Sequence, residues 1–293
     1  MNTEPIRQSL LQANKSSDSA AWVNKYSLPI YFVLAYVLSW AVEIPIALTV
    51  QGLLPFKIPL AVHYLASFGP MLAALFVVSL TEGRQGVRRL FGGLLRWRVG
   101  GGYAFFAIAV PVVLFALAVI ASRLMQGNWP DIGLLAQVDY LPRLGVLPAL
   151  GLWLLTFGLG EEIGWRGYAL PRLQAGRSAY SAALILGVLW AGWHLPAFFY
   201  RDTYTAMGLL LGIPILLISV TAASVTMTWL YNGTQGSLLM IVLFHGLFNF
   251  FSVSSAGGSG SPIVMSAVIV FWAVRALKVY GPATLNPGEK QIW

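Results

Sequence analysis

Eight long apolar runs, separated by short polar segments, constrain the fold of this 293-residue chain more than any other feature. A helix needs about 20 mostly apolar residues to cross the hydrocarbon core of a bilayer. The runs therefore predict an all-α membrane protein, built as a bundle of about eight transmembrane helices. They lie near residues 28–50, 58–80, 102–123, 147–171, 180–200, 207–230, 237–253 and 262–279.

Charged residues are scarce, and most of them lie between the apolar runs. They make up 10% of the chain, against about 25% of a soluble domain. Basic residues that flank membrane helices account for the net charge of +8, so we expect no nucleic-acid partner. The excess of lysine and arginine on one side predicts that both termini face the cytoplasm. The arginine-rich segment 84–98 is expected there too, as a loop or as an interfacial segment on anionic membrane lipid.

A single transmembrane domain is expected over residues 27–280, between a cytoplasmic segment at 1–26 and a cytoplasmic tail at 281–293. The first 26 residues lack the short apolar core and cleavage site of a signal peptide, so the first run should be a retained helix. The compact chain without targeting tails favours the plasma membrane of a bacterium. The chain has no cysteine, which excludes a thiolate nucleophile, a thiolate metal site and a disulfide.

Six polar side chains in three of the later runs stand out, because an ionisable group inside a bilayer is costly and usually functional. The helical rise places Glu161, His194 and His245 roughly 16, 21 and 12 Å from the cytoplasmic boundary, close enough to share one level. The six residues are Glu161, Glu162, Arg166, His194, His245 and Asn249.

Helical spacing divides the adjacent glutamates into two roles. Glu162 and Arg166 are four residues apart with the acid first, the favoured order for a helical ion pair, so both are expected to be supporting residues. Glu161 points about 100° away and can face a cavity. Asn249 is one turn beyond His245, so these two side chains share one face of their helix.

A carboxylate, two imidazoles and an amide at one depth suit the activation of water. Glu161 is the candidate general base, and His194 is expected to share the water or to protonate a leaving amine. His245 and Asn249 can donate hydrogen bonds to an oxyanion. Glu161, His194 and His245 are also a candidate zinc ligand set. No pair has the His-x-x-x-His spacing of many zinc proteases, so a metal-free mechanism is favoured and zinc remains the alternative.

These residues resemble the three motifs of the CPBP (or ABI) family of CAAX-processing and bacteriocin-processing intramembrane proteases. Each motif lies on its own predicted helix, and the three occur in order. The resemblance covers about residues 144–253 and implies that the catalytic core lies there. The stretch 65–74 in the second run is similar to a further, weaker family feature. The second motif more often has phenylalanine where this chain has tryptophan. The motifs are Glu161-Glu-x-x-x-Arg166, Trp190-x-x-x-His194 and His245-x-x-x-Asn249.

The resemblance implies a bundle of eight helices with a conical cavity open to the cytoplasmic side. It implies Glu161 as the base with His194, and His245 with Asn249 as the oxyanion hole. It further implies an intramembrane endopeptidase that cuts a membrane-associated protein or peptide near the cytoplasmic face. Both metal-free glutamate chemistry and metalloprotease chemistry have been described for the family.

Two alternatives come from other functional classes. One is a non-catalytic membrane protein, either an immunity protein or a scaffold. The other is a transporter that uses intramembrane carboxylates for proton coupling, although the sequence has no visible inverted repeat. Glu43 and His63 lie toward the outer side of their runs. His63 is expected to be structural or interfacial, and Glu43 to pair with His63 or to snorkel to the membrane surface.

Overall fold

The computed structural model describes residues 25–137, 144–258 and 260–293. Within these residues most of the chain is helical and no strand occurs. The predicted N-terminal segment 1–26 lies outside the described residues, except for Lys25 and Tyr26. The first half contains α2 (Ser27–Val50), η1 (Leu60–Phe68), α3 (Gly69–Thr81), α4 (Gly83–Gly92), η2 (Gly93–Leu95), α5 (Gly101–Gln126) and η3 (Ile132–Leu134).

The second half carries the predicted site. Its segments are α6 (Val146–Trp153), η4 (Leu154–Glu161), η5 (Ile163–Ala169), α7 (Leu170–Ala175), α8 (Ala179–Trp193), η6 (Leu195–Phe199), α9 (Asp202–Thr205), α10 (Gly208–Gly233), α11 (Leu238–Val253), η7 (Ser255–Gly257) and α12 (Ser261–Tyr280).

Within the described residues, seven helical segments are long and apolar enough to cross a membrane. The eighth predicted run corresponds to α11, which is apolar but has only 16 residues. The observed helix ends lie within four residues of the ends of the apolar runs. The predicted all-α membrane bundle is therefore confirmed. The segments that qualify by length are α2, η1 with α3, α5, α6 through α7, α8 with η6, α10 and α12.

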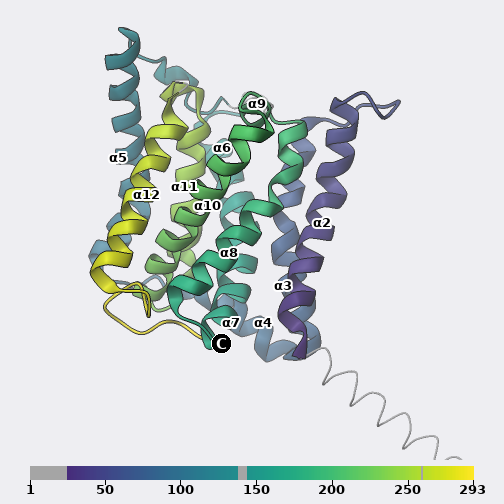
Figure 1. Cartoon of the computed structure of the whole chain (residues 1–293), viewed down its shortest axis with the longest axis vertical. Helices are drawn as coiled ribbons and strands as arrows, with labels where there is room; N and C mark the ends of the chain where they lie inside the picture. The colour runs from purple at the N-terminus through teal and green to yellow at the C-terminus, as the bar shows by residue number, and fades with distance from the viewer. Residues whose placement is uncertain (1–24, 138–143, 259) are drawn as a thin grey trace, which may run out of the picture.

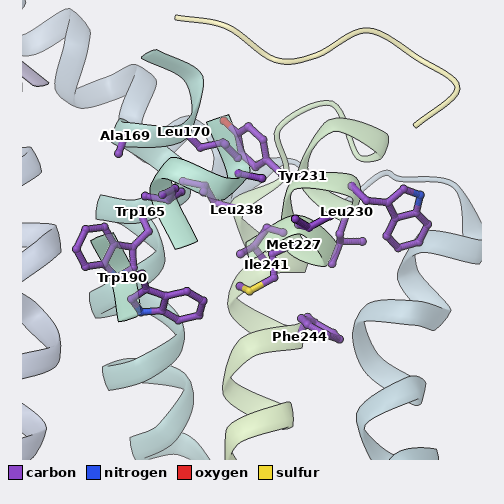
Figure 2. Packing of buried hydrophobic residues seen from close by; sticks show 14 of the residues in the cluster. Trp165, Ala169, Leu170, Trp190, Met227, Leu230, Tyr231, Leu238, Ile241 and Phe244 are labelled. Carbon is purple, nitrogen blue, oxygen red and sulfur yellow. The ribbon is translucent and has the colours of Figure 1, made fainter. Parts of the chain in front are cut away.

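The bundle places α2 along one edge and α5 with α12 along the other, with α8 and α10 between them (Figure 1). Its interior is a continuous apolar core. Figure 2 shows part of this core, to which α8 contributes Trp190, α10 contributes Met227 and α11 contributes Ile241. The outer surface is apolar as well, as at Leu210, which is 88% exposed. Lipid in place of water explains an apolar surface of this kind.

The fourth membrane segment departs from the regular α-helix on which the depth estimate rested. Residues 154–161 and 163–169 form π-helical turns, whose hydrogen bonds run over five residues. Glycines in this segment allow close contact with a neighbour: a Cβ on Gly158 would lie 2.9 Å from the backbone oxygen of Val242 in α11. Extended π turns are rare and often occur at functional sites. Here they place Glu161 and Glu162 beside α11.

The C-terminal tail packs against the end of the bundle. The backbone N–H groups of Ala179 and Tyr180, at the start of α8, donate to carbonyl oxygens of the tail at 2.9 and 3.0 Å. The buried amides of Gln174 and Asn232 bond each other reciprocally, at 3.1 and 2.8 Å, and also bond the tail backbone. Residues 281–293 therefore supply hydrogen-bond partners to the start of α8 and to the end of α10.

Candidate active site

Glu162 and Arg166 form a buried ion pair, as their spacing predicts. Both side chains are fully buried, and Nη1 of Arg166 donates to the two carboxylate oxygens of Glu162 at 2.8 and 3.0 Å. The guanidinium also lies 4.3 Å from the centre of the Trp190 ring, over its face. Such a contact is a favourable cation–π interaction in a desolvated site. Arg166 thus supplies positive charge next to two buried carboxylates.

His245 joins the ion pair from α11. Its Nδ1 lies 2.8 Å from Oε1 of Glu162, but off the direction of a hydrogen bond, so we treat the contact as electrostatic. On the other side of the ring, the amide of Asn249 donates to Nε2 at 2.9 Å. Because Nε2 accepts this bond, the neutral ring carries its proton on Nδ1, toward Glu162. Glu162 therefore contacts His245, a candidate oxyanion-hole residue, as well as Arg166. The spacing of residues along the chain did not predict this contact.

Trp190 connects the parts of the site. Its indole Nε1 donates to Oε2 of Glu161 at 2.8 Å, and its ring meets His245 edge to face, with the ring centres 5.2 Å apart. Its backbone oxygen accepts from Nδ1 of His194 at 2.8 Å. The sequence marked Trp190 only as a bulky motif residue, so its role as a hydrogen-bond donor to Glu161 was missed. The sole signal for that role was a tryptophan where the family more often has phenylalanine.

His194 caps the end of α8 and is partly exposed, whereas Glu161 is 1% exposed. A carbonyl oxygen can only accept, so the bond to Trp190 assigns the proton of His194 to Nδ1. This leaves Nε2 of His194 as a proton acceptor. The structure thus relates Glu161 and His194 through one intervening residue, Trp190.

Three side chains are close enough to hold a metal ion together. Within the described residues, Glu161, Glu162 and His245 each offer a ligand atom, and these atoms lie within 4.8 Å of one another. His194 does not belong to this group, so the set differs from the predicted set of Glu161, His194 and His245. The neighbouring charge of Arg166 already compensates one carboxylate, which weakens the attraction of the group for a cation.

Two cavities lie away from these residues. One, of about 390 Å³, is an apolar groove between α8, α10 and α12. The other, of about 840 Å³, is lined by residues after η2, the end of α10 and the C-terminal tail. Neither is lined by Glu161, His194 or His245. The conical cavity that the resemblance implies at the site stays a prediction.

Glu43 and His63 form a second buried cluster, which they share with Tyr200. The pairing of Glu43 with His63 is observed, with Oε1 of Glu43 lying 3.4 Å from Nδ1 of His63. The hydroxyl of Tyr200 donates to the same Glu43 oxygen at 3.0 Å and also bonds His63. Tyr200 was not singled out from the sequence, because nothing local links it to a glutamate 157 positions earlier.

Comparisons with known proteins agree with the motifs. A family model described as type II CAAX prenyl endopeptidase Rce1-like matches residues 143–251, an interval that contains all six predicted site residues. A curated relative, CAAX prenyl protease 2 of Methanococcus maripaludis, is 26% identical over 179 residues. That alignment covers 58% of this chain and 65% of the relative. The chain thus matches just under two thirds of the relative's length.

Proposed function

We propose that this chain, whose residues 143–251 match the Rce1-like model of type II CAAX prenyl endopeptidases, is an intramembrane endopeptidase that hydrolyses a membrane-associated protein or peptide. The observation that carries the proposal is the buried Glu161, which accepts a hydrogen bond from the indole of Trp190. The backbone oxygen of the same tryptophan accepts from the partly exposed His194. A carboxylate buried in an apolar membrane bundle is energetically costly and is therefore usually functional. Proton transfer at a hydrolytic centre is a function that uses such a group.

In the proposed reaction Glu161 is the general base. One of its oxygens accepts from Trp190, and the other takes a proton from water as the water oxygen bonds the scissile carbonyl carbon. The carbonyl oxygen becomes an oxyanion, and the C–N bond then breaks with electrons moving to nitrogen. The leaving amine takes its proton from Glu161, while Nε2 of His194 accepts a hydrogen bond from the attacking water.

Asn249 is the oxyanion donor that the geometry supports best. One of its two amide N–H bonds is engaged with His245, and the second is left for an oxyanion. With Nε2 of His245 accepting that bond, the imidazole orients Asn249 and does not itself donate from Nε2. Asn249 is thus the proposed donor, and His245, which lies between Asn249 and Glu162, orients it.

A zinc-dependent version is the second candidate, because Glu161, Glu162 and His245 can converge on one ion. We favour the metal-free version, since Arg166 already balances Glu162 and Trp190 already occupies an oxygen of Glu161. Activity after exhaustive chelation, together with elemental analysis of the purified protein, decides between them. Stoichiometric zinc that is required for turnover would reverse the assignment.

The substrate is proposed at the level of its chemistry. The relative from Methanococcus maripaludis is named as a CAAX prenyl protease. For this chain we propose a membrane-associated polypeptide that reaches the site from the cytoplasmic face, in line with the positive-inside bias. The protein is then an integral plasma-membrane enzyme with lipid as its solvent, and both termini lie in the cytoplasm.

The test compares wild-type protein with Glu161→Gln, which keeps the size of the side chain and removes the base. Peptides released from membranes that contain each protein are identified by mass spectrometry, and the rate is then measured on a reporter built from the cleaved sequence. Loss of a general base should slow cleavage about 100- to 10,000-fold, with the protein still inserted and folded. An unchanged rate would favour the scaffold reading, and flux driven by a pH gradient would favour a transporter.

A further inference from the structure

Helix α2 lies outside the interval matched by the family model, yet it contacts the segment that carries His194 at three points. Tyr36 donates from its hydroxyl to the backbone oxygen of Leu189. Trp40 donates from Nε1 to the backbone oxygen of Trp193 at 2.9 Å. The spacing of residues 36, 40 and 43 puts them on one face of the helix, and the third, Glu43, is reached by Tyr200.

The backbone around His194 explains why these donors find partners. In a continuing helix, the oxygen of Trp193 would accept from residue 197. Here the N–H of Ala197 bonds the oxygen of His194 instead, at 3.0 Å, and Pro196 has no N–H to offer. The oxygen of Trp193 is therefore open to Trp40. The indole replaces the hydrogen bond that the helix end has lost.

The approach of Tyr36 depends on a glycine. A Cβ on Gly192 would lie 2.9 Å from the Tyr36 hydroxyl oxygen, closer than ordinary van der Waals contact. The absence of a side chain at this position lets the hydroxyl reach the α8 backbone. The contact thus depends on a residue of each helix, Tyr36 of α2 and Gly192 of α8.

Beyond His194, the cluster of Glu43, His63 and Tyr200 holds the other end of the segment. All three side chains are buried, and they come from α2, η1 and the residue that follows η6. Ala197 also packs with Ile46 of α2 in a small apolar cluster. His194 therefore lies between two attachments to α2, one formed by Trp40 and one by Glu43.

We propose that Tyr36, Trp40 and Glu43 form a positioning stripe that fixes His194 relative to Glu161. The proposal rests on the proteolytic function proposed above and extends it to a helix outside the matched region. Residues at helix ends fray, because the last backbone groups lack partners within the helix. A catalytic side chain displaced by about 1 Å can cost 100-fold in rate. The stripe limits fraying of the helix end at His194, the proposed catalytic residue.

The test uses Trp40→Phe, which keeps an aromatic ring and removes the donor. Trp272→Phe is the matched control, because Trp272 is also partly buried and its Nε1 has no hydrogen-bond partner among the described residues. We expect Trp40→Phe to lower kcat about 10- to 100-fold with KM within about twofold. The control should keep the kcat of the wild-type protein. Hydrogen exchange of residues 189–201 should be faster in Trp40→Phe alone.

A second pair of variants removes the ambiguity of a folding defect. Glu43→Gln keeps an acceptor for Tyr200 and should retain most of the kcat that Glu43→Leu loses. If wild-type protein cleaves its reporter and both Trp40→Phe and Glu43→Leu cleave at the same kcat, the stripe does not position His194. If wild-type protein cleaves nothing, the proposed function fails. Hydrogen exchange then decides the stripe by itself, and equal exchange in Trp40→Phe and Trp272→Phe overturns it.

Discussion

Replacing Arg166 with methionine is the most direct test of the electrostatics at the site. The variant removes the cation that bonds both oxygens of Glu162 and leaves that carboxylate, and the adjacent Glu161, buried. Removing one partner of a buried pair typically costs about 3–5 kcal/mol. At a factor of ten for each 1.4 kcal/mol, the ratio of folded to unfolded protein falls roughly 100- to 4,000-fold. That is a large share of the roughly 5–15 kcal/mol that keeps a protein folded.

The double variant Glu162→Gln/Arg166→Met separates lost charge balance from lost packing. It removes both charges together, and buried pairs replaced by uncharged groups of similar volume are often no less stable. We therefore expect the double variant to be more stable than Arg166→Met by at least about 2 kcal/mol. Arg84→Met is the control, since Arg84 is exposed on α4 and should change stability by less than about 0.5 kcal/mol.

The measurement is equilibrium unfolding in mixed micelles, titrated with a denaturing detergent and followed by tryptophan fluorescence. Two results would refute the reasoning. One is an Arg166→Met protein as stable as the wild type. The other is a double variant no more stable than Arg166→Met, which would mean that packing, and not charge, accounts for the loss.

Three further predictions concern other contacts in the bundle. Gly158→Ala should lower the free energy of unfolding by about 1–3 kcal/mol, because its Cβ would meet the backbone of α11. Gly151→Ala has open space around its Cβ and should be neutral or stabilising by up to about 1 kcal/mol. Unfolding in micelles compares the two variants. Asn232→Ala removes a donor to the tail backbone and should increase proteolysis within residues 281–293, and an unchanged cleavage pattern would contradict it. Trp190→Phe should lower kcat about tenfold through loss of one charge-assisted hydrogen bond, and an unchanged kcat would show that Glu161 is held by other contacts.

Much of the fold was predictable because hydrophobic burial in a bilayer is a local property of sequence. An apolar run of sufficient length specifies a membrane helix wherever it occurs, and the observed helices follow the runs closely. The ion pair of Glu162 with Arg166 was predictable for a similar reason, since a spacing of four residues brings side chains together on one helix.

Contacts between helices were not predictable in the same way. The bond from Trp190 to Glu161, the contact of His245 with Glu162 and the bond from Trp40 to the α8 backbone each join separate helices. Several packings of the same apolar helices would satisfy the hydropathy pattern equally well. The choice among them depends on close fit, as where glycine lets one backbone approach another.

By itself, the sequence determined that this chain is a helical membrane protein and which polar residues interrupt its apolar runs. The tertiary structure alone decided which of those polar side chains contact one another. It placed Glu162 against both Arg166 and His245, gave Glu161 the indole of Trp190, and attached the end of α8 to α2. The physical reason is that hydrophobicity acts residue by residue along the chain, whereas a hydrogen bond between helices requires both backbones to be in place.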